Sequence, residues 1–228
     1  MKKKQVAVIG LGRLGYSLAT TLTSLGHDVL ALDWEEGSVR EIASQVTHAV
    51  QADATSESVL RELGIGNFDI AIVTIGEAIE KSVLATILLK KVGVPYVIAR
   101  AENELHGSIL EKIGADKVFY PEQEMGVMIA HVLNLGDVID YIPVVPGYGV
   151  LKLTVPSYFV GNTLSGVGFG MSGKSEVAVL LSERKSEIIV APGTDEKIQT
   201  GDILIVGGNA DKLEELFTKA SRAKTERK

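Results

Sequence analysis

The sequence predicts an α/β protein with a doubly wound, mostly parallel sheet, followed by a smaller α+β lobe. Through about residue 136, short apolar runs alternate with helical segments and are joined by short links. This alternation is typical of βαβ units, whose strands pair in parallel. From about residue 140 it gives way to proline- and glycine-rich sequence and closely spaced apolar runs. We therefore expect two domains, residues 1–136 and residues 140–221.

A glycine-rich turn joins the first predicted strand, Gln5 to Ile9, to the first predicted helix, Tyr16 to Leu25. The turn, Gly10-Leu11-Gly12-Arg13-Leu14-Gly15, fits the dinucleotide-binding pattern G-x-G-x-x-G in the strand-to-helix context that this pattern requires. The first glycine permits the tight turn, the second lets a pyrophosphate approach the backbone, and the third lets the helix pack closely. We thus expect a Rossmann-like domain whose helix N-terminus faces the phosphates.

The other elements of this domain follow in order. The run Asp69 to Thr74 is apolar on successive residues, as expected for a strand buried on both faces. The further strands are His27 to Leu32, Thr47 to Gln51, Asp69 to Thr74, Pro95 to Arg100 and Lys117 to Tyr120, and the helices are Glu35 to Ser44, Ser56 to Leu63, Glu77 to Val92, Asn103 to Ile113 and Glu122 to Leu135.

The helix Glu122 to Leu135 carries an apolar stripe. Packing on its own domain and packing on a partner subunit both explain such a stripe, and periodicity leaves the two open. The stripe consists of Met125, Met128, Ile129, Val132 and Leu133.

The second domain is expected to be rich in antiparallel strand. Tyr141 to Gly149 contains prolines and glycines and predicts a linker or a hairpin, and Ser182 to Ser186 predicts a hairpin turn. The expected strands are Val150 to Val155, Val177 to Leu181, Glu187 to Val190 and Ile203 to Val206, closed by a helix from Asn209 to Ala220.

Composition excludes several classes of function. The net charge of −6 argues against broad binding to nucleic acid or to an anionic membrane. The chain has no cysteine, which excludes disulfides and thiolate chemistry and fits a reducing cytoplasm. No apolar run approaches the ~20 residues that cross a bilayer. We expect a cytoplasmic protein with no nucleic-acid partner and no direct membrane insertion.

Polar residues follow the predicted strands at the sheet edge where ligands bind in open α/β folds. Asp33 ends the second strand 23 residues after Gly10, a spacing that suits a carboxylate accepting hydrogen bonds from ribose hydroxyls. The same charge repels a 2′-phosphate, which argues against NADP. Glu77 equally suits a charge at a helix N-terminus. The expected cofactor-binding residues are Gly10, Leu11, Gly12, Arg13, Leu14, Gly15, Asp33, Trp34, Asp53, Ala54, Thr55, Thr74, Ile75, Gly76, Glu77 and Arg100.

Arg13 lies inside the phosphate loop, where dinucleotide dehydrogenases often carry an apolar residue. A guanidinium there suits a terminal phosphate, which favours ATP or ADP over NAD or NADH. The alternative is an exposed arginine on the first helical turn, which the helix dipole disfavours. Arg100, at the end of the fifth strand, is a second cation at the same edge.

A second phosphate-loop pattern, G-x-x-x-x-G-K-[ST], is matched in full by Gly168 to Ser175. A true loop of this type follows a buried strand and opens a helix. No convincing strand precedes this match, and Glu176 to Leu181 predicts a strand where the helix should be. We interpret the match as coincidental.

The sequence contains no arrangement that predicts catalysis. No nucleophile–base pair and no metal-ligand spacing is present, and the second domain has no histidine that could serve as an acid or base. We expect no catalytic residue and no enzyme. The four histidines are scattered over the first domain, at His27, His48, His106 and His131.

Taken together, these segments resemble the KtrA/TrkA proteins, the cytosolic RCK (regulator of potassium conductance) subunits of bacterial potassium transporters. The resemblance covers nearly the whole chain, and it is the combined order of motifs that is specific. The segments are the glycine turn, Asp33, Asp53 to Thr55, Lys112 to Asp116, Pro121 to Gly126, Val160 to Leu164, Val190 to Pro192 and Thr200 to Val206.

The resemblance implies a nucleotide-sensing regulatory subunit that gates a membrane-embedded potassium channel or transporter. ATP and ADP would compete at the Rossmann site and favour different ring shapes, with Arg13 near the terminal phosphates. It implies a homodimer formed through the helix Glu122 to Leu135, an octameric ring, and a location at the inner face of the cell membrane. The alternative from another class is a small NAD-dependent oxidoreductase.

Two further ligands come from the resemblance alone. Glu122 matches a glutamate that, in some members, helps bind a divalent cation, Mg²⁺ or Ca²⁺, at the dimer interface; a carboxylate favoured by the helix dipole explains it equally. Some members bind cyclic di-AMP between paired C-terminal lobes, but the stretch Gly166 to Gly173 departs from the usual pattern there. Glu77 also differs from the small residue expected beside the phosphates.

Overall fold

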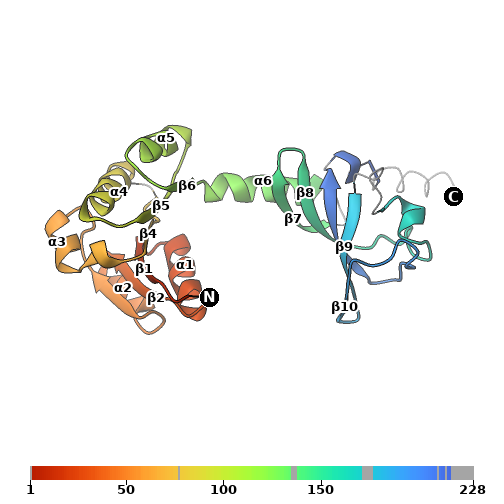
Figure 1. The fold of residues 1–228 in the computed structure, drawn as a ribbon, viewed down its shortest axis with the longest axis horizontal. Coiled ribbons are helices and arrows are strands. Elements are labelled where there is room, and N and C mark those ends of the chain that lie inside the picture. Colours follow the sequence, from red (N-terminus) through yellow and green to blue (C-terminus); the bar gives the residue numbers. More distant parts are fainter. Residues whose placement is uncertain are drawn as a thin grey trace. The chain divides into compact units, whose positions relative to one another are not determined.

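The computed structural model describes residues 2–76, 78–134, 138–170, 177–209, 211–213 and 215–216. The chain divides into two compact units, Met1–Glu122 and Gln123–Lys228 (Figure 1). The division falls near the start of helix α6 (Pro121–Asn134), earlier than the boundary at residue 136 expected from the sequence. Among the described residues, no helix is both long and apolar enough to cross a bilayer.

The first unit is a parallel six-stranded sheet in the order β3-β2-β1-β4-β5-β6, which confirms the doubly wound fold. The strand order reverses between β1 and β4, the point where ligands bind in such sheets. The strands are β1 (Gln5–Ile9), β2 (Asp28–Asp33), β3 (His48–Gln51), β4 (Ile70–Val73), β5 (Tyr96–Arg100) and β6 (Lys117–Phe119), and the helices are α1 (Arg13–Ser24), α2 (Glu36–Ile42), α3 (Glu57–Glu62), the 3₁₀ turn η1 (Ile65–Asn67), α4 (Ile79–Val92) and α5 (Glu104–Lys112).

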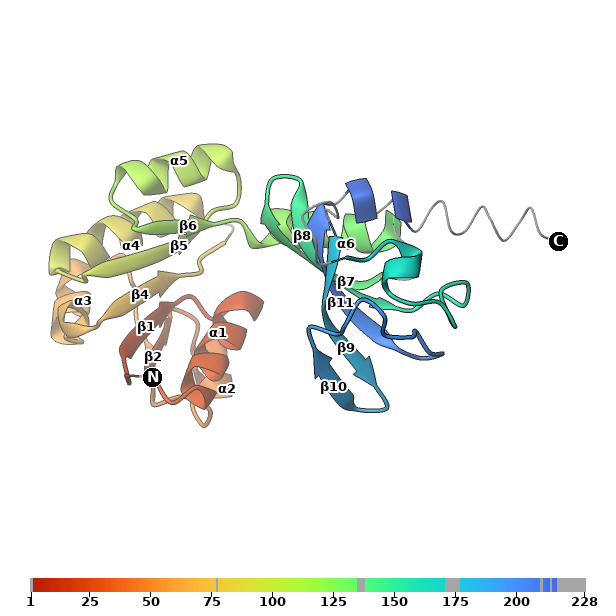
Figure 2. The same cartoon turned by 45° about the vertical axis from the view of Figure 1, so that its right-hand side comes forward.

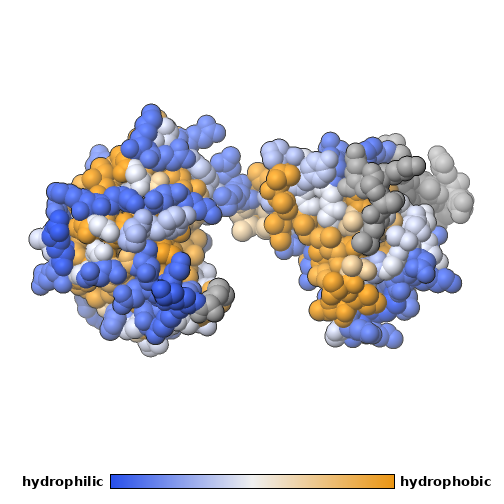
Figure 3. Space-filling model, in the orientation of Figure 1, coloured by the Kyte–Doolittle hydropathy of each residue, from blue (hydrophilic) through white to orange (hydrophobic). Residues whose placement is uncertain are grey.

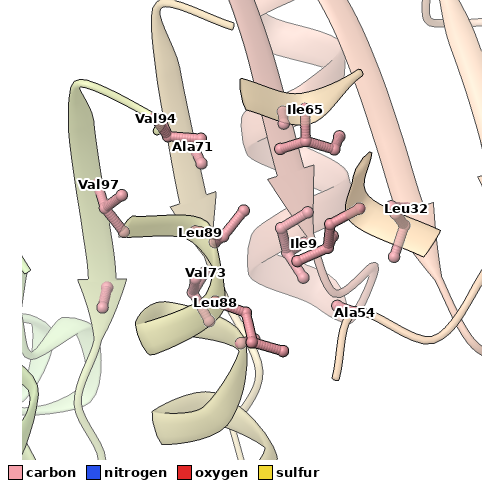
Figure 4. Close-up of a cluster of buried hydrophobic side chains, with 14 of the residues drawn as sticks. Ile9, Leu32, Ala54, Ile65, Ala71, Val73, Leu88, Leu89, Val94 and Val97 are labelled. Carbon is pink, nitrogen blue, oxygen red and sulfur yellow. The ribbon is translucent and has the colours of Figure 1, made fainter. Parts of the chain in front are cut away.

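Successive residues of β1 enter two different cores, which explains its unbroken apolar run. Ala7 and Ile9 pack with residues of α3, α4 and α5, and this cluster is drawn in Figure 4. Val6 and Val8 pack on the opposite face with residues of α1 and α2. The two sets of helices therefore cover opposite faces of the sheet, as can be followed in Figure 2.

The second unit contains an antiparallel five-stranded sheet in the order β10-β9-β11-β8-β7. The proline- and glycine-rich stretch forms the β7–β8 hairpin, with Gly147 at φ +76°, so it is a hairpin rather than a linker. Of the expected closing helix Asn209 to Ala220, residues 211–213 and 215–216 are helical, whereas Asn209 is the last residue of strand β11. Residues 210, 214 and 217–220 lie outside the described residues. The elements are β7 (Val138–Val145), β8 (Tyr148–Thr154), the 3₁₀ turn η2 (Ser165–Val167), β9 (Val177–Arg184), β10 (Glu187–Val190) and β11 (Ile203–Asn209).

An arginine fork ties β9 to the loop before β11. The Arg184 Nε and Nη2 atoms donate to the two carboxylate oxygens of Asp202 at 2.9 and 2.8 Å, and Nη1 donates to Glu196 at 3.0 Å. Asp202 is only 1% exposed. Burial alone would raise the pKa of Asp202, but the hydrogen bonds from Arg184 and from the Gln199 amide outweigh it and hold that pKa below its usual value.

Apolar side chains remain on the surface of the second unit. Figure 3 shows them gathered over the β9–β10 hairpin, where Leu180, Ile188 and Val190 are exposed. The stripe on α6 is split between core and surface. Met128 and Val132 pack against the core of the second unit, whereas Met125, Ile129 and Leu133 are exposed.

Candidate functional site

A cavity of about 800 Å³ lies at the carboxyl ends of the strands of the first unit. Because the strands are parallel, the residues that follow them meet at one edge. The cavity is lined by Ile9, Gly10, Gly12, Leu32, Asp33, Trp34, Gln51, Ala52, Asp53, Ala54, Thr55, Thr74, Ile75, Gly76, Ala78, Lys81 and Arg100.

The three glycines of the turn have three different environments. Gly10 has φ +97°, which glycine adopts without strain, and its amide donates to the Leu32 carbonyl at 2.8 Å. A Cβ on Gly12 would meet nothing within 4 Å, because this residue faces the cavity at the N-cap of α1. A Cβ on Gly15 would stand 1.9 Å from the Gly10 carbonyl oxygen, so α1 can approach the turn only without a side chain there.

Two aspartates follow neighbouring strands. The carboxylate of Asp33 accepts from the Leu11 amide at 2.5 Å and from the Glu35 amide at 2.9 Å. A carboxylate offers about four lone-pair sites, so acceptor capacity remains for a ligand. Asp53 accepts from the hydroxyl and the amide of Thr55 at 2.6 and 2.9 Å. These hydrogen bonds, with a smaller contribution from Lys81, hold the pKa of Asp53 below its usual value, so it is a fixed anion.

The other side of the cavity is built from the ends of β4 and β5. Thr74 is buried, and its hydroxyl contacts the carbonyls of Ile9 and Gly10 at 3.1 and 2.7 Å. The guanidinium of Arg100 lies against Gly76, where a Cβ would stand 2.2 Å from Nη1. Arg100 also pairs with Glu122 on the first turn of α6. Its buried Nε has no hydrogen-bond partner among the described residues.

Most of the sequence-predicted residues line this cavity, and four of those that the structure describes do not. Leu11 is buried in the core beneath α1 and α2, and Gly15 packs against Gly10. Arg13 is exposed on the first turn of α1, and neither it nor Leu14 lines the cavity. Glu77 lies outside the described residues.

The predicted metal ligand Glu122 is exposed and paired with Arg100. No group of three or more carboxylate, histidine or cysteine residues that could hold a metal occurs in the described part of the chain. A cation at Glu122 would therefore need ligands from outside these residues.

Sequence reasoning missed several lining residues, of which Lys81 is the most distinctive. It lies in the first turn of α4, and its Nζ is 5.1 Å from the centroid of the Trp34 ring. Its place in the first turn of the helix after β4 is the signal that could have found it. The other missed residues are Ile9, Leu32, Gln51, Ala52 and Ala78.

The second phosphate-loop pattern has no suitable context in the part that the structure describes. The 3₁₀ turn η2 precedes Gly168, and strand β9 begins at Val177, so neither the strand nor the helix of a true loop is present in residues 162–170 and 177–184. Residues 171–176 of this segment lie outside the described residues.

None of the histidines in the described residues lines the cavity. His106 is 1% exposed, and burial, with a smaller contribution from Arg100, lowers its pKa despite the nearby Glu102. It therefore packs as a neutral ring in α5. The lining offers glycine amides, anions and cations, which can bind a phosphorylated ligand.

Comparison with known proteins identifies the family and the fold of this chain. Residues 6–121 match the TrkA-N domain family. The chain is 41% identical to the Ktr system potassium uptake protein C of Bacillus subtilis over 91% of this chain and 93% of that protein. The RCK domain of GsuK has a TM-score of 0.63 and 16% identity, covering 95% of this chain and 48% of that one.

A further solved structure is similar to about half of the chain. The NAD(P)-binding domain of an exopolyphosphatase-related protein from Archaeoglobus fulgidus has a TM-score of 0.50 and 26% identity, covering 55% of this chain and 93% of that one. With the family match and the identity over nearly the full length, the chain belongs to the KtrA/TrkA family.

Proposed function

We propose that the protein is a nucleotide-sensing regulatory subunit that gates a membrane potassium channel or transporter. The observation that carries this proposal is the cavity bounded by the open Gly12 backbone and by Asp33, in a chain whose relatives are potassium uptake proteins. Residues 1–136 are proposed to form the nucleotide-binding domain, and residues 140–221 the regulatory lobe.

The proposed ligand is ATP or ADP. Gly10 and Gly12 would face the phosphates at the N-terminus of α1, and Asp33 would accept hydrogen bonds from the ribose. The remaining predicted residues that line the cavity would surround the nucleoside. Arg13 would pair with a terminal phosphate; its exposed position on α1 leaves the guanidinium open to solvent for that role.

The output of the site is proposed to be a change of shape. A ligand shifts a conformational equilibrium only by its different affinity for the two states, so ATP and ADP must bind the two ring shapes unequally. The proposed assembly is a homodimer through α6 that forms an octameric ring beneath its membrane partner, at the cytoplasmic face. The exposed Met125, Val127, Ile129 and Leu133 on α6 supply apolar surface for such a contact.

Two further ligands remain proposals from the family. Glu122 is proposed to bind Mg²⁺ or Ca²⁺ at the dimer interface, and cyclic di-AMP is proposed as a ligand of the second lobe. Because Glu122 is paired with Arg100, a cation would have to compete with this ion pair.

The second candidate is a small NAD-dependent oxidoreductase, supported by the similarity to an NAD(P)-binding domain. No histidine occurs among the described lining residues, so the acid or base that hydride transfer to a carbonyl uses beside the nicotinamide would have to come from Asp33, Asp53 or Lys81. Turnover of NADH with any substrate would favour this candidate.

Thermal-shift titration with ATP, ADP, NADH, NADPH and cyclic di-AMP, with and without Mg²⁺ or Ca²⁺, tests the ligand. We expect ATP and ADP to raise the melting temperature and to give different solution scattering profiles. Identical profiles with the two nucleotides would contradict the proposed mechanism.

The Arg13→Ala variant tests the terminal-phosphate role. We expect it to lose stabilisation by ATP and to keep that by adenosine. Arg40→Ala is the matched control, because Arg40 is exposed on α2 and pairs with Glu36 away from the cavity. Equal loss of ATP and adenosine binding in Arg13→Ala would remove Arg13 from this role.

A further inference from the structure

Trp34 and Lys81 stand together at one end of the cavity. Trp34 follows Asp33 in the link between β2 and α2 and is 68% exposed, an unusual position for so large an apolar ring. Its carbonyl accepts from the Gln51 side chain at 3.1 Å, which ties this link to the end of β3. Lys81 belongs to α4 and places its Nζ 5.1 Å from the indole centroid.

The strand order shows which part of a ligand would meet this pair. Along the sheet edge, the glycine turn follows β1, Asp33 ends β2 with Trp34 directly after it, and Ala52 to Thr55 follow β3. A nucleotide with its phosphates at the turn and its ribose at Asp33 therefore extends its base toward β3. The small side chains Ala52 and Ala54 leave room there, and Trp34 is the one aromatic ring in the described lining.

We propose that Trp34 is the platform on which the purine base of the bound nucleotide stacks, and that Lys81 is a positioning residue that holds the indole ring over the cavity. This proposal rests on the proposed function of the same site. Indole presents a broad π face to a purine, and an ammonium near that face is attracted by the ring quadrupole. Because α4 starts beyond β4, on the other side of β1, the pair joins two opposite walls of the cavity.

The chain contains a single tryptophan, so its fluorescence reports this ring alone. We would titrate the full-length protein with ATP, adenosine and inorganic tripolyphosphate, following tryptophan emission and, separately, heat by calorimetry. Both adenine compounds should change the emission saturably, whereas tripolyphosphate should bind with no such change. Equal changes with all three would overturn the assignment of the base to Trp34.

Single substitutions test the stacking role of Trp34 and the positioning role of Lys81 separately. Trp34→Ala should weaken ATP binding about tenfold and leave tripolyphosphate binding unchanged, since base stacking on an aromatic ring is lost. Lys81→Met should weaken ATP binding by a smaller factor, and Lys81→Arg, which restores a cation, should recover it. Lys91→Met is the matched control, because Lys91 pairs with Glu57 outside the cavity.

The outcomes distinguish the stacking role of Trp34 from the proposed nucleotide-sensing function. If calorimetry detects no nucleotide binding to the unaltered protein, the proposed function fails and this inference fails with it. If ATP binds but Trp34→Ala binds it equally well, only the platform is wrong. If Lys81→Arg is as weak as Lys81→Met, Lys81 has no positioning role through its charge.

Discussion

Alanine at Gly15 tests how closely α1 packs on the glycine turn. The new Cβ would stand 1.9 Å from the Gly10 carbonyl oxygen and 2.6 Å from Thr74 Oγ1. Real Cβ contacts stay beyond 3.0 Å, so helix and turn must separate by about 1.1 Å, the difference between 3.0 and 1.9 Å. The same movement disturbs the hydrogen bond that the Thr74 hydroxyl donates to Gly10 at 2.7 Å.

The cost follows from these contacts. Overpacking a close-packed interior costs ~1–3 kcal/mol, and a lost neutral hydrogen bond costs about 1 kcal/mol. We expect Gly15→Ala to lower the unfolding free energy of the first unit by about 3 kcal/mol, equivalent to roughly 10 °C in Tm for a unit of this size. ATP binding should fall as well, because the turn that faces the phosphates is displaced.

Gly12→Ala is the matched control. Its Cβ meets nothing within 4 Å, and its φ of −64° and ψ of −176° are accessible to alanine. We expect its Tm to stay within about 2 °C of the unaltered protein, with ATP affinity reduced because the methyl group enters the cavity. Calorimetric unfolding of both variants, with and without ATP, measures the two effects. A Gly15→Ala protein whose Tm equals that of the unaltered protein would refute the packing argument.

Two further predictions concern titratable groups away from the cavity. Arg184→Met should lower the unfolding free energy of the second unit by about 3 kcal/mol, because it leaves the Asp202 carboxylate buried without its ion-pair partner. Urea titration measures this loss. An effect below about 1 kcal/mol would show that water replaces the hydrogen bonds that Arg184 donates. Burial lowers the pKa of His106, so the unfolded chain binds the extra proton more readily, and stability present above the ordinary histidine pKa of about 6.5 should be lost as the pH falls below it. His106→Gln should flatten this pH dependence, whereas the exposed-site variant His48→Gln should retain it.

The parallel sheet was predictable from sequence because its strands are buried on both faces. Val6 to Ile9 form an unbroken apolar run for that reason, and the glycine turn fixes where the run ends. In this parallel sheet the strand ends were predicted within one residue, as with the predicted Asp69 to Thr74 and the observed β4 at Ile70–Val73. Gly12 and Asp33 were found as cavity residues because their positions depend only on the single βαβ unit formed by β1, α1 and β2.

Features that depend on tertiary packing were not predictable. The contact of Lys81 with Trp34 joins α4 to the end of β2, on opposite sides of β1, so no local pattern encodes the contact itself. The hairpin of β7 and β8 was ambiguous because Pro143 and Pro146 suggest a linker, yet proline is tolerated in β7 since this strand lies at the sheet edge. The partial burial of Met128 and Val132 beside the exposed Ile129 depends on the core of the second unit.

The central place of β1 also has a consequence for synthesis of the chain. β1 pairs with β2 on one side and with β4 on the other, and β4 begins only at Ile70. A nascent chain that ends before this strand has one open edge on β1 and lacks Thr74, whose hydroxyl braces the Gly10 carbonyl. Because Thr74 is missing until then, the glycine turn acquires its final form only after about a third of the chain has left the ribosome. Non-local pairing of this kind also slows folding. A nucleotide added during translation would therefore stabilise chains longer than this point and none shorter.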